Sequence, residues 1–464
     1  MDLGRFKDKK IALLGFGIEN ISVAMFFLKH GIDFVILDKE DDKLGNPEGQ
    51  KLIDDNKLTI ITGKKYLSTL SDFNMVIRSP GVPYLTKEIQ SAKSSGVEIT
   101  SSTKLFFDHS PAKIVGVTGT KGKGTTASLI TEILKASRKS KVKSLKSKVY
   151  LAGNIGVPSF DIVENIKSDD LVVFELSSFQ LQDMESSPHI AVVVNLADDH
   201  LDYHQTLDEY RATKQNILKY QSASDFAVIN QDYSESRKLA EFGKAKKYFF
   251  SSKEKIESGA YVDVAGDVFV NIDGEEKICS QNELKLIGRH NLENIACAAI
   301  VGKILQVPTN AIHDAVKEFN GLPHRLEFIR EVDGIKFYND SFSTNPTPTI
   351  AAIKSFSDPI TIILGGSSKG ADFSELAEEI GNSSVQNVVV IGIEGPRIRS
   401  ALEKSEIKVN IINGGKSIES IITAALKNTS AGGVILFSPA CASFDMFKNY
   451  KDRGEKFKLA VGKL

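Results

Sequence analysis

Residues 114–126 read IVGVTGTKGKGTT, in which a short apolar strand runs into a turn of glycines and lysines. Glycines allow backbone N–H groups to point inward at phosphate oxygens, and the helix-forming residues that follow add a positive N-terminal end. Lys123 would place its charge against the β- and γ-phosphates. The stretch predicts a nucleotide triphosphate site, with a plain surface turn as the alternative. The residues expected to hold the phosphates are Gly119, Thr120, Lys121, Gly122, Lys123, Gly124 and Thr125.

The turn departs from the usual phosphate-loop spacing, G-x-x-x-x-G-K-[ST]. Val117 stands where the first glycine is expected, and Gly124 takes the place of the hydroxyl residue after Lys123. Thr125 is therefore the residue whose hydroxyl is expected to serve Mg²⁺.

The composition is that of an ordinary enzyme. The chain has 464 residues, enough for about three domains, and 41% of them are hydrophobic. The net charge of -1 gives no reason to expect a nucleic-acid or membrane partner. The cysteines are far apart, lack metal-ligand spacing and fit a reducing compartment. No apolar run approaches the roughly 20 residues of a membrane helix, so we expect a cytoplasmic protein.

Strand-like and helical patterns alternate along the chain, which predicts an α/β fold with parallel sheets covered by helices. The first block, 1–110, has a strand, the turn Gly15-Phe16-Gly17, a helix and a second strand ending in Asp38. This is half of a Rossmann unit, but Asn20 replaces the third glycine of G-x-G-x-x-G. A nicotinamide site and a uridine or other nucleotide site both remain open. A rigid turn, Ser79-Pro80-Gly81, follows a later strand, where ligands of open sheets bind.

The second block, 111–322, brings polar side chains to the sheet edge that carries the phosphate turn. Glu175 ends one apolar strand, and Asn195 ends another that continues into the acidic cluster 198–202 around His200. Carboxylate and phosphate oxygens are the ligands that Mg²⁺ favours. Glu175 and His200 are therefore expected to bind Mg²⁺, with an ordinary surface or core histidine as the alternative for His200.

The third block, 323–464, has the pattern of a second Rossmann-like domain, with apolar strands at 360–364, 388–391 and 434–437. It lacks G-x-G-x-x-G, so we expect it to bind something other than a dinucleotide. A domain large enough for its own substrate favours transfer to a bound acceptor over simple hydrolysis.

Together these motifs resemble those of one family, the Mur ligases of peptidoglycan synthesis and their folate-polyglutamate relatives. The resemblance covers essentially all 464 residues, with the motifs in the family's order. They are GTKGK at 119–123, GNIG at 153–156, ELSSFQ at 175–180, DHLD at 199–202, HNxxN at 290–294, LPHR at 322–325 and NDS at 339–341. The block SPACASFDMFKN at 438–449, followed by Arg453-Gly454, is similar to that of the members that add D-glutamate.

The resemblance implies three domains, the central one of P-loop ATPase type, and an ATP-dependent amide ligase. In such an enzyme the carboxylate of UDP-N-acetylmuramoyl-L-alanine takes the γ-phosphoryl group of ATP, and the amine of D-glutamate attacks the acyl phosphate. A carboxylate and a triphosphate repel, so Lys123 and Mg²⁺ must neutralise charge before the two approach in line. The expected cofactors are ATP and Mg²⁺, the partners are small molecules, and the protein is expected to be a monomer.

The resemblance also implies roles for individual residues. Lys214 matches a lysine that is carbamylated in this family, and a carbamate is an anionic oxygen ligand where an ammonium would be repelled by the metal. An exposed helix lysine is the alternative. The expected metal ligands are Thr125, Glu175, His200 and carbamylated Lys214. The further nucleotide contacts are Asn291, Asn294, Arg325 and Asp340. The UDP-substrate contacts are Gly15, Gly17, Ile18, Asp38, Ser79, Pro80, Gly81, Asn154 and His200. The D-glutamate contacts are Asp199, Thr344, Lys369, Ser443, Phe444 and Tyr450.

Three positions depart from the family pattern. Gly124 replaces the usual serine or threonine, Phe342 stands where many members carry lysine, and Ser367 stands where some place aspartate. None of these changes removes a group that the chemistry requires.

Three rival interpretations remain testable. Another Mur ligase or a folylpolyglutamate-type ligase is the nearest, although the block 438–449 argues against the latter. A nicotinamide-dependent oxidoreductase is a different class, disfavoured by Asn20. A catalytically inactive nucleotide-binding protein is disfavoured by the intact Lys123, Glu175 and His200.

Overall fold

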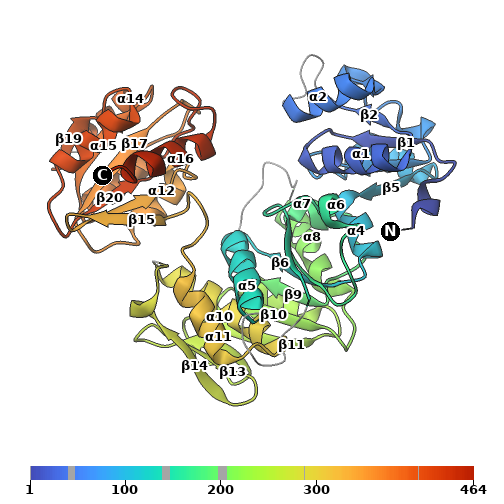
Figure 1. The fold of residues 1–464 in the computed structure, drawn as a ribbon, viewed down its shortest axis with the longest axis horizontal. Helices are drawn as coiled ribbons and strands as arrows, with labels where there is room; N and C mark the ends of the chain where they lie inside the picture. Colours follow the sequence, from blue (N-terminus) through green and yellow to red (C-terminus); the bar gives the residue numbers. More distant parts are fainter. Residues whose placement is uncertain (1, 40–46, 138–146, 197–205, 287, 406) are drawn as a thin grey trace. The chain divides into compact units, whose positions relative to one another are not determined.

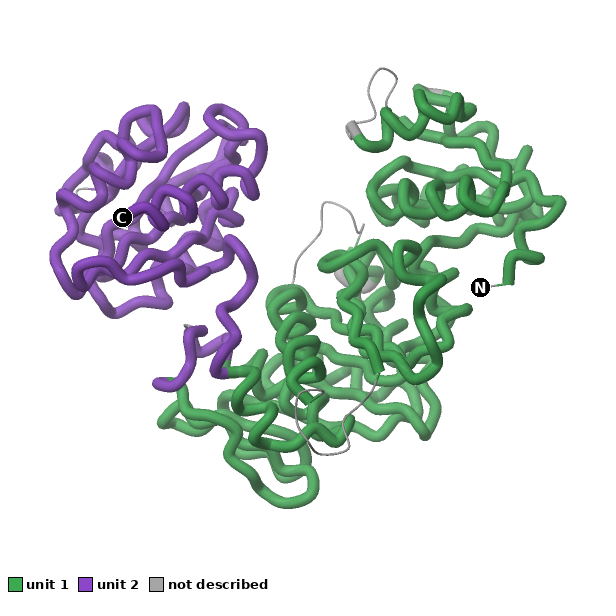
Figure 2. Tube along the Cα trace, in the orientation of Figure 1, with its two compact units in different colours: residues 1–281, 292–316 green, residues 282–291, 317–464 purple. Residues whose placement is uncertain are grey.

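The computed structural model describes residues 2–39, 47–137, 147–196, 206–286, 288–405 and 407–464, and its strands form three sheets (Figure 1). By its internal contacts the chain divides into two compact units (Figure 2). Residues 1–281 with 292–316 form the first unit, which holds two of the sheets. Residues 282–291 with 317–464 form the second unit, which holds the third sheet.

The first sheet is five-stranded and parallel, in the order β3-β2-β1-β4-β5. Its strands are β1 (Ile11–Leu14), β2 (Val35–Leu37), β3 (Ile60–Ile61), β4 (Met75–Arg78) and β5 (Glu98–Ser101). Its helices are α1 (Ile18–His30), α2 (Pro47–Asn56), α3 (Lys87–Ser94) and α4 (Ser102–His109). The strand order reverses between β1 and β4, so the turns after these two strands border the crevice where such sheets bind ligands.

The second sheet has nine strands in the order β14-β13-β12-β11-β10-β9-β6-β8-β7. Its strands are β6 (Lys113–Thr118), β7 (Val149–Gly153), β8 (Leu171–Glu175), β9 (Ile190–Val193), β10 (Phe226–Asn230), β11 (Lys246–Ser251), β12 (Gly259–Val262), β13 (Asp267–Asn271) and β14 (Glu275–Ser280). The accompanying helices are α5 (Lys123–Ser137), α6 (Ser159–Ile162), α7 (Ser178–Leu181), α8 (Leu207–Lys219), α9 (Ser234–Lys238), α10 (Arg289–Ile304) and α11 (Thr309–Glu318).

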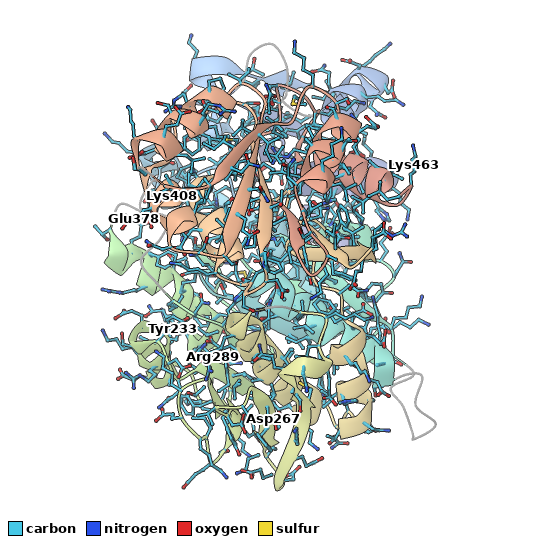
Figure 3. The ribbon with its side chains drawn as sticks, turned by 90° about the vertical axis from the view of Figure 1, so that its left-hand side faces the viewer. Tyr233, Asp267, Arg289, Glu378, Lys408 and Lys463 are labelled. Atoms are coloured by element: carbon cyan, nitrogen blue, oxygen red, sulfur yellow. The ribbon has the colours of Figure 1, made fainter. Side chains whose placement is uncertain are left out.

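An antiparallel extension ends this second sheet, which the expectation of parallel sheets did not foresee. β13 pairs antiparallel with β12 on one side and with β14 on the other. Asp267, which is labelled in Figure 3, is the first residue of β13. The connections between these strands are too short for a helical crossover, so each strand runs antiparallel to the strand before it and lies next to it. The strands from β7 to β12 are parallel, and those beside the phosphate turn are buried apolar runs.

The third sheet has the order β15-β16-β20-β17-β18-β19, parallel except for β15. Its strands are β15 (Glu327–Val332), β16 (Ile335–Asn339), β17 (Ile360–Gly365), β18 (Val385–Ile391), β19 (Asn410–Asn413) and β20 (Val434–Phe437). Its helices are α12 (Pro346–Ile353), α13 (Ser374–Gly381), α14 (Gly395–Lys404), α15 (Ile418–Lys427) and α16 (Tyr450–Val461). One apolar core includes residues of α12 to α14 and a second includes residues of α15 and α16, so helices cover both faces.

The described part of the chain also has short 3-10 helices, η1 (Leu3–Phe6), η2 (Gly63–Lys65), η3 (Leu70–Asp72), η4 (Leu239–Glu241) and η5 (Gln281–Glu283). No described helix is long and apolar enough to cross a membrane. The predicted α/β fold with three domains is confirmed. The boundaries near residues 110 and 322 stay predictions.

Candidate active site

The phosphate turn follows β6, which lies between β8 and β9 in the second sheet. All three strands are parallel, so the turn lies at the edge where their carboxyl ends meet. Gly122 has a φ of 80°, and a Cβ there would lie 2.7 Å from the side-chain oxygen of Asn294. The backbone therefore needs glycine at this position both for its conformation and for space.

Two asparagines form hydrogen bonds with the phosphate turn and with the start of α5. Asn195, just beyond β9, accepts from the N–H of Thr120 at 2.8 Å through its carbonyl, and from that of Lys121 at 2.8 Å through its side chain. Asn294 accepts from the Thr126 hydroxyl at 3.1 Å. The side-chain oxygen of Asn294 thus supports the first turn of α5, and its direct contact with a nucleotide stays a prediction. Asn195 was identified from sequence only as a strand end, since nothing in the pattern shows which loop it holds.

Two lysine side chains contact the backbone of the turn. The ammonium of Lys123 donates to the Thr120 carbonyl at 3.0 Å. Lys214, on α8, donates to the Thr118 hydroxyl at 2.7 Å and to the Gly119 carbonyl at 3.4 Å. Lys214 is only 1% exposed, so the alternative of an exposed helix lysine is wrong. A buried ammonium requires such partners, because desolvating an unpaired charge is costly.

Glu175 lies at the same sheet edge. It is the last residue of β8, pairs with Val117 of β6, and is 3% exposed. Its carbonyl accepts from the backbone N–H of Asn154 at 3.1 Å, which places the turn after β7 beside it. Its carboxylate and the hydroxyl of Thr125, in the first turn of α5, are oxygen donors of the kind that Mg²⁺ prefers, so this donor set fits the ion.

Of the predicted metal ligands, His200 lies outside the described residues, as does Asp199, which is predicted to contact D-glutamate. Within the part of the chain that the structure describes, no group of three or more histidine, cysteine, aspartate or glutamate residues is arranged to hold a metal ion.

The turn after β1 is locked by a buried amide. Asn20, fully buried, donates to the carbonyls of Leu14 at 3.2 Å, Gly15 at 2.8 Å and Ile77 at 3.1 Å, and so links β1 to β4. Asp38 accepts from the N–H of Phe16 at 2.6 Å. Asn20, which replaces the third glycine of the dinucleotide pattern, thus stabilises the turn through hydrogen bonds to the backbone. Ile18, at the start of α1, is 65% exposed.

Arg78 connects the turn after β4 to α7 and the loop that follows it, a role that sequence reasoning missed. Its guanidinium, fully buried, donates to the Val82 carbonyl at 2.7 Å and also to Ser79. It donates across to the Phe179 carbonyl at 3.2 Å and to Asp183 at 3.1 Å. The only available signal was a charged residue closing an otherwise apolar strand.

The motif at 175–180 makes a contact between helices α7 and α1. Gln180 accepts from the Ser177 N–H at 2.9 Å and donates to Glu19 at 2.7 Å. Burial raises the pKa of Glu19, and its hydrogen bonds with Ser102 and Gln180 oppose that rise. The motif thus positions α7 against α1.

In the second unit, Asp340 lies at the carboxyl end of β16. It accepts from the hydroxyls of Ser343 at 2.5 Å and Ser438 at 2.6 Å, and from the Leu326 N–H at 3.1 Å. Burial raises the pKa of Asp340 to about 6, against the lowering effect of these hydrogen bonds and of Arg325.

The residues predicted for the amino acid lie on loops after β17 and β20. Ser367 donates through its N–H to Ala442 at 2.8 Å, which joins the loop of Lys369 to the loop of Ser443 and Phe444. Lys369 is exposed, Phe444 is 70% exposed, and Ser443 is 2% exposed. Tyr450 begins α16, and Thr344 precedes α12.

Arg453 supports these loops and was noted from sequence only as part of a motif. Its guanidinium, 1% exposed, donates to the carbonyls of Cys441 at 3.0 Å, Ala442 at 3.2 Å and Ser341 at 2.8 Å. Burial lowers its pKa to about 10. One buried cation thus ties the loop after β20 to the loop after β16.

Family models match three parts of the chain. They are the Mur ligase MurD-like N-terminal domain at residues 9–101, the Mur ligase middle domain at 117–302, and the Mur ligase glutamate ligase domain at 324–441. A UDP-N-acetylmuramoylalanine–D-glutamate ligase of Clostridium kluyveri is 39% identical over 459 residues, which are 98% of this chain and 97% of that protein. The enzyme of the same name from Acetivibrio thermocellus is 38% identical over 466 residues, covering 99% and 97%.

Solved structures share the fold at lower identity. UDP-N-acetylmuramate-alanine ligase MurC of Thermotoga maritima matches with a TM-score of 0.59 and 19% identity, covering 98% of this chain and 99% of that one. MurF of Acinetobacter baumannii matches with a TM-score of 0.58 and 14% identity, covering 93% and 85%.

Proposed function

The chain belongs to the Mur ligase family, and we propose that it is the ATP-dependent ligase that adds D-glutamate to UDP-N-acetylmuramoyl-L-alanine in peptidoglycan precursor synthesis. One structural observation carries the proposal. The phosphate turn, the side chains of Lys123 and Lys214 that contact it, and the buried Glu175 all lie at the carboxyl ends of β6 and β8. The near full-length similarity to D-glutamate ligases supports the choice of amino acid.

The reaction has two steps. A carboxylate oxygen of the UDP-substrate attacks the γ-phosphorus of ATP, the bond to the β–γ bridging oxygen breaks, and ADP and an acyl phosphate form. The D-glutamate amine then attacks the acyl carbon, loses a proton, and inorganic phosphate leaves as the amide forms. Both steps bring anions together, so the main task of the protein is to neutralise charge and hold the groups in line.

We propose that Lys123 and the N–H groups of residues 119–125 hold the triphosphate. Lys123 already faces the turn through its bond to Thr120, and α5 presents its N-terminal end there. Glu175, Thr125, His200 and carbamylated Lys214 are the proposed ligands of Mg²⁺, which supplies positive charge against the phosphates. The further nucleotide contacts proposed are Asn291, Asn294, Arg325 and Asp340.

The UDP-substrate is proposed to bind the first sheet at the carboxyl ends of β1 and β4. The proposed contacts are Gly15, Gly17, Ile18, Asp38, Ser79, Pro80, Gly81, Asn154 and His200. The supporting observation is the reversal of strand order between β1 and β4, where the two turns meet.

D-glutamate is proposed to bind the third sheet at the carboxyl ends of β17 and β20. The proposed contacts are Asp199, Thr344, Lys369, Ser443, Phe444 and Tyr450. Lys369 would neutralise a carboxylate of the amino acid, and its loop is held beside that of Ser443 by the bond between Ser367 and Ala442.

The proposed domains are 1–110 for the UDP-substrate, 111–322 for ATP and 323–464 for the amino acid. We propose that the protein acts as a cytoplasmic monomer on small molecules, without a nucleic-acid or membrane partner.

An amino-acid panel in a phosphate-release assay tests this function. Release of ADP and phosphate should require UDP-N-acetylmuramoyl-L-alanine, D-glutamate and Mg²⁺ together. Turnover with L-alanine, L-lysine or meso-diaminopimelate but not with D-glutamate would assign the chain to another ligase of the family. Turnover of a folate substrate would assign it to the folylpolyglutamate branch, and a change in NAD(P)H fluorescence on adding protein would favour an oxidoreductase.

A further inference from the structure

Arg325 lies on a turn whose backbone is held in an uncommon conformation on both sides of it. His324 and Leu326 have φ values of 66° and 44°, in the left-handed region that residues other than glycine rarely adopt. The N–H of Phe342 donates to the His324 carbonyl at 3.0 Å, and that of Leu326 donates to Asp340 at 3.1 Å. Such strain persists only where the surroundings over-determine the backbone, so the path of the chain at Arg325 is set by the end of β16.

The side chain of Arg325 is stacked on an aromatic ring. Its guanidinium carbon lies 3.8 Å from the centroid of Phe342. Tyr450 meets the same ring edge-on, with the centroids 5.1 Å apart and the planes at 87°. Phe342 is 37% exposed, so burial of its apolar surface does not by itself explain why the ring lies against both Arg325 and Tyr450.

This stack controls the direction of the hydrogen-bond donors. The five N–H groups of a guanidinium lie in its plane, and a ring against its face leaves them directed outward from the stack. That is the geometry in which a guanidinium donates to a phosphate or carboxylate in pairs. The ring attracts the cation through its quadrupole and so holds the guanidinium against its face.

We propose that Phe342 is a positioning residue, held by Tyr450, that orients the guanidinium of Arg325 for hydrogen bonding to a phosphate oxygen of the bound nucleotide. The inference rests on the proposed function, since it requires that this protein binds ATP. Phe342 itself touches no reacting atom and acts through Arg325.

Binding of a non-hydrolysable ATP analogue with Mg²⁺ to the full chain, measured by calorimetry, tests the proposal. Phe342→Leu keeps an apolar side chain and removes the ring face, whereas Phe342→Tyr keeps the face. Phe342→Leu should raise the Kd for the analogue about two- to fivefold, the size of an exposed cation–π interaction. Phe342→Tyr should leave the Kd unchanged. The Kd for the UDP-substrate and the thermal unfolding midpoint should stay at their wild-type values in both variants, which separates orientation of Arg325 from damage to the fold.

A double-mutant cycle shows whether Phe342 acts through Arg325. In an Arg325→Ala background, Phe342→Leu should have no further effect on the Kd. The matched control is Tyr220→Leu, which removes another exposed ring, with the ammonium of Lys219 5.3 Å from its centroid, outside the proposed sites. This control should leave the Kd unchanged.

An unchanged Kd in Phe342→Leu, or additive effects of the two substitutions, would overturn the inference while leaving the proposed function intact. If the wild-type chain bound no nucleotide, the proposed function would fall and the inference with it.

Discussion

Ser367 and Asp445 exchange two hydrogen bonds between the loops that follow β17 and β20. The Ser367 hydroxyl donates to the Asp445 carboxylate at 3.2 Å and accepts from the Asp445 N–H at 2.8 Å. The same carboxylate accepts from the N–H of Ile393 at 3.0 Å, after β18. One aspartate thus joins three loops at the sheet edge proposed for D-glutamate.

Ser367→Asp should impair use of D-glutamate. The new carboxylate would face that of Asp445, and like charges in contact repel by about 1 kcal/mol or more. We expect the KM for D-glutamate to rise about fivefold or more, from that energy, while the KM for ATP changes less. Steady-state kinetics with each substrate varied in turn measures this. Ser367→Ala is the matched control, with a smaller rise, and equal KM values in wild type and Ser367→Asp would show that the loop of Lys369 is placed by other contacts.

Lys123→Ala should abolish turnover. In the proposed site its charge would face two anions, and the side chain of Lys214 is already hydrogen-bonded to Thr118 and Gly119. Phosphate release under saturating substrates measures the loss. Retention of more than about a tenth of the activity, a barrier change below ~1.4 kcal/mol, contradicts the proposed role. Lys121→Ala, at an exposed position of the same turn, is the comparison and should be less damaging.

Lys214→Ala should also be nearly inactive, and the compound that restores turnover identifies the state of the residue. If Lys214 carries a carbamate, acetate or formate should partly restore activity by supplying an anionic oxygen ligand in the vacated space. An unmodified ammonium bonded to Thr118 should instead be replaced by small amines. Rescue by amines alone would exclude the carbamate.

Arg78→Lys should weaken binding of the UDP-substrate more than that of ATP. Lysine cannot bridge the turn after β4 and Asp183 at once, because its donors share a single nitrogen. The lost buried hydrogen bonds should lower the free energy of unfolding by about 1–3 kcal/mol. Denaturant titration and KM measurements check both effects. Arg5→Lys, at a partly exposed pair with Glu98, should change the free energy of unfolding by less than about 1 kcal/mol.

Asp340 should make the protein less stable as pH rises through the acid range. Burial raises the pKa of Asp340 to about 6 from 3.8, so between these values the folded state binds more protons than the unfolded state. The unfolding free energy should therefore fall as pH rises from about 4 to 6, by about 3 kcal/mol from this group. Denaturant titration of wild type and Asp340→Asn across that range measures the difference. A difference between the two proteins that does not vary with pH would mean that Asp340 keeps an ordinary pKa.

The positions of the buried strands and of the phosphate turn could be predicted from the sequence alone. A parallel strand covered on both faces is a continuous apolar run, as at 171–174 and 434–437. The glycines of 119–124 are typical of a turn that binds phosphate. These signals are local in the chain, so they needed no knowledge of neighbours. The same locality accounts for the correct placement of Glu175 at a strand end.

The polar residues that support the loops could not be predicted from the sequence, because their partners are set by the three-dimensional fold. Asn20, Arg78 and Arg453 donate to backbone carbonyls of strands or loops distant in sequence, and no spacing rule reveals such partners. The stack of Arg325 on Phe342 likewise depends on how the turn at 322–326 meets the end of β16. Residue type and local pattern specify what a side chain can do, whereas its partners follow from the packing of sheets that the pattern alone does not encode.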